Sequence, residues 1–458
     1  MMNFWGTVIV LLLTFGQGIA QNPDKLQALW QQEGLKHAAI GVSVKNVAGG
    51  EVVYEHNPGM ALRPASVLKL LPTSLALKLK GDSLTYQTKV FYTGEIKEGL
   101  LQGNIVIEAG GDPCLDSKYF KDAVFTKRLV DSIVGLGIRR IEGAVIIQGE
   151  GEQPYIPGSW PWEDIANYYG ALYHPFNYRD NTYTVTLTSG KPGTRTRVVS
   201  VIPSVPGVKL QNEVLASVKQ QDDAWIYGGP EASVLLVRGT IPANRSSFAV
   251  KGAMHKPASV FRAEIEKELK AKNIIVEKKK GVSTECREWF TVESPLLKEI
   301  VFYTNKNSVN LFAEALGALV NPSDFETTVK QELSAIGIDS TGITIKDACG
   351  LSPSNALPAE VITDLLLWAK SHLGDSFFAS LPRGGIDRGL RVYSADPVLG
   401  GNLRAKTGSM FGVRALAGYL STRNGETLAF TIFVNNYTGD PVKIQETIRD
   451  FLRELANS

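Results

Sequence analysis

The sequence predicts an α+β fold in which a β-rich region is inserted into a domain of mixed helices and strands. Three observations support this. Near the N-terminus, two segments alternate apolar and polar residues as strands do. Short strands separated by turns fill residues 84–280. From about Ser294 the chain is mainly helical until three further strands appear. A chain of 458 residues is also too long for one ordinary core, so two or three domains are expected.

Residues 21–83 form the first part of the mixed domain. The segment "DKLQALWQQEGLK" predicts a helix with one apolar face, and residues 38–58 predict a hairpin of two alternating strands. A loop follows, and then residues 63–79, "RPASVLKLLPTSLALKL", whose leucines recur at helical spacing. This stretch predicts the start of a buried helix.

Residues 84–280 form the predicted insertion, one or two small β domains with helices near Tyr119–Leu136 and Ser259–Lys272. Residues 281–458 complete the mixed domain: two helical segments around the polar break "TNKNS", two further helices, three strands and a last helix. The N-terminal hairpin and the three late strands are expected to join in one antiparallel sheet of about five strands, with helices on both faces.

Composition and charge narrow the class of protein. Apolar residues make up 44% and charged residues 21%, and the formal net charge of +2 gives no argument for nucleic-acid binding. Residues 1–20 predict a signal peptide. Their apolar run is too short to span a bilayer, and it ends in small residues that place the cleavage site after Ala20. No cysteine stands directly after that cut to carry a lipid anchor, and no later stretch predicts a transmembrane helix, so an exported, periplasmic protein is expected.

The sequence offers no pattern for a metal or another cofactor. The three cysteines, Cys114, Cys286 and Cys349, match no zinc spacing, and the five histidines are scattered. An odd number of cysteines leaves at least one unpaired. We interpret them as mostly small buried residues, although one disulfide remains open.

Ser66 and Lys69 are the first residues that indicate chemistry. Three apart at the start of a helix, they share one face, and a lysine whose pKa is lowered by burial can accept the proton of a serine hydroxyl. The N-terminal N–H groups of a helix stabilise negative charge, which favours an oxyanion site there. Taken alone, the pair is better interpreted as a capping serine and a lysine whose amine reaches solvent.

Two further short motifs are equally ambiguous on their own. "SVN", with Ser308 and Asn310, lies in the polar break between two helices and fits a helix cap. "KTGS", from Lys406 to Ser409, lies on a strand expected to be interior, where a lysine is unusual; a strand end with a bulge is the alternative.

The three motifs together, S-x-x-K, S-x-N and K-T-G in this order, resemble the serine β-lactamases and penicillin-binding proteins. About 240 residues separate Ser66 from Ser308, too many for a compact β-lactamase. A β-rich insertion at this point resembles the D-alanyl-D-alanine carboxypeptidase/endopeptidase family, penicillin-binding protein four type (low-molecular-mass class C). Four further stretches are similar to that family: "EAGGDPCL", "NLFAEALG", "DACGLSPSN" and "LPRGGIDRGLR". The resemblance covers nearly the whole mature chain. Two departures are Cys349, where the family usually has serine, and Val309, where many relatives are acidic.

The resemblance implies a β-lactamase/transpeptidase-like domain that hydrolyses the terminal D-Ala-D-Ala bond of peptidoglycan stem peptides, and D-Ala cross-links, through an acyl-enzyme that β-lactams also form. It implies that Ser66 is the nucleophile, Lys69 the general base and Ser308 a proton relay. It also implies that Asn310 binds the substrate amide and orients Lys69. The other substrate-binding residues that it implies lie on a strand: Lys406, Thr407, Gly408 and Ser409.

Two alternatives stay open: a β-lactamase, and a non-catalytic peptidoglycan-binding protein, which would be expected to have lost Ser66, Lys69 or Lys406. Oligomeric state is not predicted. An aromatic run in the insertion is compatible with a sugar or peptide groove, but core packing under a loop is the favoured interpretation. Its members are Trp160, Trp162, Tyr168, Tyr169 and Tyr173.

Overall fold

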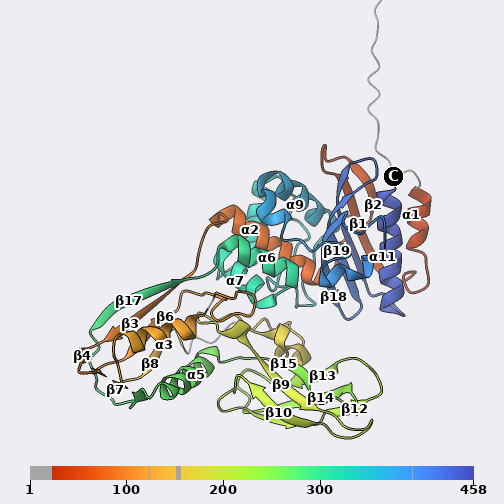
Figure 1. Cartoon of the computed structure of the whole chain (residues 1–458). Helices are drawn as coiled ribbons and strands as arrows, with labels where there is room; N and C mark the ends of the chain where they lie inside the picture. The colour runs from red at the N-terminus through yellow and green to blue at the C-terminus, as the bar shows by residue number, and fades with distance from the viewer. Residues whose placement is uncertain (1–22, 123, 151–155, 395, 458) are drawn as a thin grey trace, which may run out of the picture.

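The computed structural model describes residues 23–122, 124–150, 156–394 and 396–457, so the predicted signal peptide lies outside the described residues. Figure 1 shows a body of helices and one large sheet, from which the middle of the chain extends as a separate β-rich part. No helix among the described residues has the length and apolar character needed to cross a membrane.

The two ends of the chain meet in one five-stranded antiparallel sheet, as predicted, with the order β18-β19-β20-β1-β2. Strand β1 pairs with β20 along its whole length, from Ala39 opposite Asn435 to Asn46 opposite Leu428. The strands are β1 Ala39–Asn46, β2 Val52–His56, β18 Leu403–Met410, β19 Val413–Ser421 and β20 Thr427–Asn435.

Helices cover both faces of this sheet because its strands alternate on two apolar sides. Along β20, Phe430 and Ile432 pack into a core with α1 and α11, whereas Ala429 and Phe433 face a second core built by the other helices. These helices are α1 Pro23–Leu29, α2 Leu70–Lys80, α6 Leu297–Asn307, α7 Asn310–Val320, α8 Phe325–Ala335, α9 Ala359–His372, α10 Gly374–Phe378 and α11 Pro441–Ala456, with the 3-10 turns η1 Ala65–Lys69 and η4 Arg388–Tyr393.

Helix α2 is the centre of the helical layer. All residues from Leu70 to Leu77 are buried, which fits a helix that is apolar on every side. It continues directly from η1, so the predicted helix opens with a 3-10 turn that carries Ser66 and Lys69.

The prediction that Lys406 lies on an interior strand is wrong, because β18 is an edge of the sheet. Lys406 is nevertheless buried, with 1% of its surface exposed. The turn η1 packs against both β18 and β19, and residues 382–384 pair with the edge of β18 next to the lysine.

The middle of the chain forms two β units. The first has the sheets β17-β3-β6-β8 and β16-β7-β5-β4 with helices α3 and α5, and the second has the sheets β10-β9-β15 and β11-β14-β12, with β13 on β14. Strand β17 pairs with β3, so the sheet of the first unit continues past residue 280. The elements are β3 Gln87–Thr93, β4 Ile96–Lys97, β5 Leu100–Leu101, β6 Ile105–Glu108, α3 Phe125–Gly135, β7 Arg140–Ile141, β8 Val145–Gln148, α4 Trp162–Ile165, η2 Tyr168–Gly170, η3 Arg179–Asn181, β9 Thr182–Thr188, β10 Arg197–Ile202, β11 Lys209–Asn212, β12 Leu215–Ser217, β13 Asp223–Tyr227, β14 Val234–Pro242, β15 Phe248–Ala253, α5 Pro257–Ala271, β16 Ile275–Val276 and β17 Cys286–Glu293.

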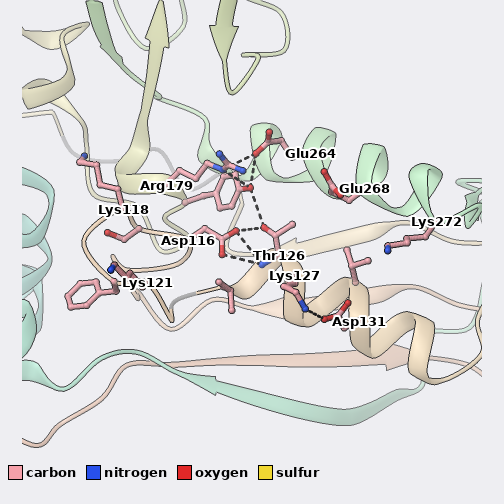
Figure 2. Close-up of a pocket in the computed structure, with 15 residues that line it drawn as sticks. Asp116, Lys118, Lys121, Thr126, Lys127, Asp131, Arg179, Glu264, Glu268 and Lys272 are labelled. Atoms are coloured by element: carbon pink, nitrogen blue, oxygen red, sulfur yellow. Dashed lines mark hydrogen bonds and ion pairs between the residues drawn. The ribbon is translucent and has the colours of Figure 1, made fainter. Parts of the chain in front are cut away.

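A cavity of about 600 Å³ lies between α3 and α5 in the first unit (Figure 2). Its walls carry charges of both signs, several of which are already paired: Arg179 with Glu264, and Lys127 with Asp131. None of the residues predicted to do chemistry lines this cavity.

Candidate active site

Ser66 and Lys69 lie side by side in η1. The Lys69 Nζ atom donates a hydrogen bond to Ser66 Oγ at 3.0 Å, to Asn310 Oδ1 at 2.6 Å and to the Cys349 carbonyl at 2.6 Å. Burial lowers the pKa of Lys69, and the nearby Cys349, Asp347 and Glu314 act in the opposite direction. A lysine with a lowered pKa can be neutral near pH 7, and a neutral amine can accept the proton of the serine.

Two glycines allow other segments to approach this turn closely. A Cβ atom at Gly408 would lie 2.6 Å from the Pro64 carbonyl oxygen and 3.1 Å from the Ser66 nitrogen. A Cβ at Gly350, where φ is +81°, would lie 2.0 Å from the Ala65 carbonyl oxygen. Because any side chain would clash with this backbone, the glycine of the K-T-G motif is needed for the protein's own packing around Ser66.

Ser308 and Lys406 form a second serine–lysine pair. Lys406 Nζ donates to Ser308 Oγ at 2.9 Å and to the Thr407 carbonyl at 2.8 Å. Ser308 ends α6 in the left-handed conformation, with φ of 56°, and so projects from the break between α6 and α7. Burial, together with the charge of Lys69, holds the pKa of Lys406 well below its usual range.

Asn310 connects the site to the insertion. Its side-chain oxygen accepts from Lys69, and its Nδ2 donates to the backbone carbonyl of Tyr169 at 2.7 Å. Tyr169 lies in η2 of the insertion, far from Asn310 in sequence. This contact could not be predicted from the sequence, since any residue type can supply a backbone carbonyl.

The remaining predicted residues line the outer end of β18. Thr407 is partly exposed and Ser409 exposed, and the Arg414 guanidinium of β19 donates to Ser409 Oγ. Ser409 and Arg414 are directly opposite in the β18–β19 pairing. Arg414 was missed from the sequence, although a cation across from the K-T-G strand could have been found from the strand register.

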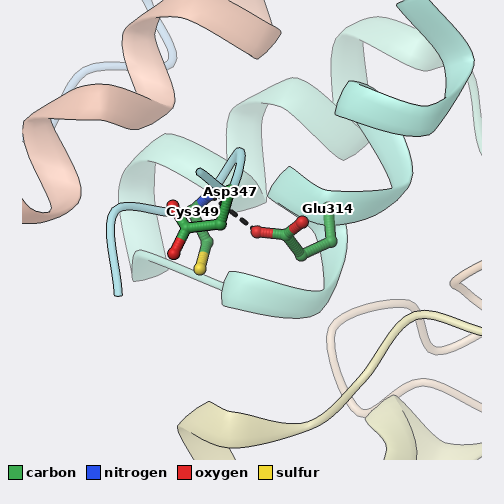
Figure 3. A group of neighbouring side chains, drawn as sticks. All are labelled: Glu314, Asp347 and Cys349. Atoms are coloured by element: carbon green, nitrogen blue, oxygen red, sulfur yellow. Dashed lines mark hydrogen bonds between the residues drawn. The ribbon is translucent and has the colours of Figure 1, made fainter. Parts of the chain in front are cut away.

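Buried acids hold the loop that contacts Lys69 (Figure 3). The Glu314 carboxylate accepts the backbone N–H of Ala348 at 3.0 Å and that of Cys349 at 2.8 Å. Burial and the neighbouring Asp347 raise the pKa of Glu314 to about 7. Ligand atoms of Glu314, Asp347 and Cys349 lie within 4.8 Å of one another, which is close enough for a shared ion. Both carboxylates, however, already accept backbone N–H groups, so the cluster serves to place the Cys349 carbonyl on Lys69.

The cysteines do not form disulfides. Cys114 and Cys349 are buried, Cys286 is exposed, and all three are free thiols. The Cys349 thiol lies beside the Glu314 carboxylate, a place that the serine hydroxyl usual at this position can also occupy.

All the predicted site residues therefore meet at one place, where η1, the α6–α7 break and β18 converge. One serine–lysine pair opens a buried helix, a second lies beside it, and an asparagine contacts the lysine of the first pair. This arrangement defines a protein of the serine β-lactamase and penicillin-binding class.

The comparisons with known proteins identify the family. Residues 23–456 match the D-Ala-D-Ala carboxypeptidase 3 (S13) family, so the chain belongs to this family. It is 26% identical to a D-alanyl-D-alanine carboxypeptidase of Actinomadura sp. (strain R39), over 99% of this chain and 88% of that protein. It is 25% identical to the D-alanyl-D-alanine carboxypeptidase DacB of Haemophilus influenzae, over 88% and 86% respectively.

Solved structures agree on the fold. The crystal structure of penicillin binding protein 4 (dacB) from Haemophilus influenzae covers 94% of this chain and 98% of its own, with a TM-score of 0.77 and 21% identity. The same protein has also been solved in complex with a β-lactam, with a TM-score of 0.71, 21% identity, and 95% and 98% of the two chains covered. The predicted fold class, family and type of enzyme, a D-Ala-D-Ala carboxypeptidase, are confirmed.

Proposed function

We propose that this chain is an exported serine DD-peptidase that removes the terminal D-Ala from peptidoglycan stem peptides through an acyl-enzyme on Ser66. The observation that carries the proposal is the 3.0 Å hydrogen bond between Ser66 Oγ and the buried Lys69 amine, whose pKa is lowered by burial. Nothing in this site requires a cofactor, since the serine and two lysines supply the nucleophile and the proton carriers.

Acylation begins when Ser66 Oγ attacks the carbonyl carbon of the penultimate D-Ala and gives its proton to Lys69. The negative charge on the carbonyl oxygen is stabilised by the backbone N–H groups of Ser66 and Ser409. The C–N bond then breaks as the leaving nitrogen takes a proton from Ser308, and Lys406 replaces that proton across the 2.9 Å contact. The two lysines together gain one proton and lose one, so their total charge is unchanged.

Hydrolysis completes the cycle. Water attacks the ester carbonyl and gives one proton through Ser308 to Lys406, which acylation had left neutral. The bond to Ser66 Oγ then breaks and this oxygen recovers the proton held by Lys69, so both lysines return to their starting states. Asn310 holds both the substrate amide and Lys69, and its own amide is fixed by the Tyr169 carbonyl.

The substrate carboxylate is expected to bind at the outer end of β18. Thr407 and Ser409 offer hydroxyl groups there, Gly408 keeps the strand close to Ser66, and Lys406 and Arg414 supply positive charge. A β-lactam presents a similar carbonyl and carboxylate, so it would acylate Ser66 and keep its amine tethered after ring opening.

Cleavage of D-Ala cross-links is a second activity of the same site. One of the solved structures with this fold is described as a predatory peptidoglycan endopeptidase from Bdellovibrio bacteriovorus, with a TM-score of 0.52, 16% identity, and 90% and 92% of the two chains covered. An endopeptidase reaction needs the same acylation chemistry with a larger leaving group, and the partly exposed Ser66 leaves room for one.

The test is D-Ala release from a short D-Ala-D-Ala peptide by purified protein, with mass spectrometry after exposure to penicillin. We expect a stable penicilloyl adduct on Ser66, turnover of the peptide, and loss of both in a folded Ser66→Ala variant. Rapid penicillin hydrolysis without peptide turnover would identify a β-lactamase. Peptidoglycan binding without any acylation would identify a non-catalytic binding protein.

A further inference from the structure

An exposed row of aromatic side chains extends from the active site along the insertion. Trp162 is 61% exposed, Tyr168 49% and Trp225 37%. The sequence favoured core packing for this aromatic run, which is correct for the buried Trp160 but wrong for Trp162 and Tyr168. Single exposed aromatic residues are common on protein surfaces, but several in mutual contact mark a binding surface.

Three of the rings are in contact, with the partly exposed Tyr169 between the other two. The Tyr169 ring lies 5.2 Å from the Tyr168 ring and 6.4 Å from the Trp225 ring, measured between centroids. At its far end Trp162 lies over the segment that follows β13, where a Cβ at Gly229 would be 3.7 Å from the indole. We call these four aromatic side chains, Trp162, Tyr168, Tyr169 and Trp225, the aromatic ridge.

The ridge is held rigidly by a buried asparagine. Asn167 Nδ2 donates to the carbonyls of Glu163 at 2.5 Å and Ile226 at 3.2 Å, and its Oδ1 accepts the Ile226 N–H at 3.0 Å. These bonds fasten α4 and η2 to β13, on which Trp225 points away from the buried Ile226. A preorganised aromatic surface binds a ligand with a small loss of conformational entropy.

The ridge begins at the catalytic residues. The backbone carbonyl of Tyr169 accepts from Asn310, whose oxygen in turn accepts from Lys69. The segment that carries the ridge therefore adjoins the residue that holds Lys69.

We infer that the aromatic ridge binds sugar rings of the peptidoglycan glycan strand to which the stem peptide is attached. The ring faces of Trp162 and Trp225 offer flat apolar area that suits the C–H faces of sugars. The ridge carries the carboxylates of Glu163 and Asp164 on the same short helix, which accept hydroxyl and amide hydrogens and repel an acidic peptide. The inference rests on the proposed function, since it takes the substrate to be a peptide linked to sugar.

The experiment compares two substrates with the full-length enzyme: a short D-Ala-D-Ala peptide, and a muropeptide with the same stem attached to its sugars. For Trp162→Ala and Trp225→Ala we expect kcat/KM on the muropeptide to fall about tenfold and kcat/KM on the short peptide to stay within about twofold. Val199→Ala, at an exposed position on β10, is the matched control, and thermal unfolding checks that each variant is folded.

A binding measurement separates this inference from the proposed function. Glycan strands stripped of stem peptides should bind the wild type and quench its tryptophan fluorescence, and this should be lost in Trp162→Ala. Such binding in a protein that releases no D-Ala would uphold the ridge and overturn the proposed activity. Equal losses on both substrates, no loss on either, or binding of free stem peptide instead of stripped glycan would each overturn the inference.

Discussion

Glu314 and Lys69 are joined through a single residue, because the Glu314 carboxylate accepts the Cys349 N–H at 2.8 Å and the Cys349 carbonyl accepts from Lys69 at 2.6 Å. The acid therefore both fixes the carbonyl that holds the lysine and adds negative charge that raises the pKa of Lys69 against the effect of burial. Glu314 is a positioning residue, and its effect should be visible in the pH dependence of acylation.

Glu314→Gln should move the pH profile of penicillin acylation to lower pH. The amide oxygen can still accept the two backbone N–H groups, but the charge is gone, so the pKa of Lys69 falls and its neutral form persists at lower pH. The pKa of Glu314 is about 7, so the difference should be largest above that pH, where the wild-type acid is ionised.

The measurement is the rate of acylation between pH 5 and 10, with Glu360→Gln on α9 as a surface control. Glu314→Ala, which leaves two backbone N–H groups unpaired, should lower the rate about 10- to 100-fold at all pH values. An unchanged pH profile in Glu314→Gln would show that the charge does not act on Lys69.

Lys406→Met should abolish acylation while keeping the fold. Among the described residues the Lys406 amine bonds only to Ser308 Oγ and the Thr407 carbonyl, so this polar group is buried without an acidic partner. Replacing it with an apolar side chain of similar length removes that cost, and the melting temperature should stay equal or rise. Acylation should fall by orders of magnitude. Near-normal acylation with a lower melting temperature would assign Lys406 a structural role instead.

The sequence predicted the side chains of the site because each belongs to a short motif, but it could not predict what holds them. The carbonyls of Cys349 and Tyr169 contact Lys69 and Asn310 from segments far away in the chain, and any residue type could supply them. The position of β18 at the sheet edge was missed for a related reason. Several of its side chains are as buried as those of a central strand, because η1 packs on β18 and β19 and residues 382–384 pair with the edge.

Acid should destabilise the protein through two buried histidines of the insertion. His174 and His255 are each more than nine-tenths buried, and burial lowers the pKa of each to about 4. The folded protein keeps them neutral while the unfolded chain takes up protons below about pH 6.5, so stability should fall as the pH drops from 6.5 to 4. The loss for each is roughly 3 kcal/mol at the lower end of that range.

The check is the free energy of unfolding measured by urea at several pH values. His255→Gln should flatten the pH dependence between 6.5 and 4, whereas His372→Gln, at an exposed position, should leave it unchanged. An equal slope in both variants would exclude the buried histidine as the source.

The insertion also contacts the active-site loop through Trp160, and this contact should affect catalysis. The indole Nε1 donates to Asp347 Oδ2 at 2.8 Å, beside the Ser352 N–H, which donates to the same oxygen at 2.6 Å. Trp160→Phe keeps most of the apolar packing but removes one of these two donors, which should cost about 1–2 kcal/mol of stability.

Because Asp347 lies in the loop that presents the Cys349 carbonyl to Lys69, we expect Trp160→Phe to slow acylation several-fold, even on a short peptide that does not reach the insertion. Trp289→Phe, on β17 away from this loop, is the control that removes an indole without touching Asp347. Stopped-flow acylation by a chromogenic β-lactam gives the rate, and urea unfolding gives the stability. If Trp160→Phe lost stability but acylated at the wild-type rate, the insertion would stabilise the fold without affecting the position of the general base. A slower rate would mean that the insertion helps to set the position of the general base.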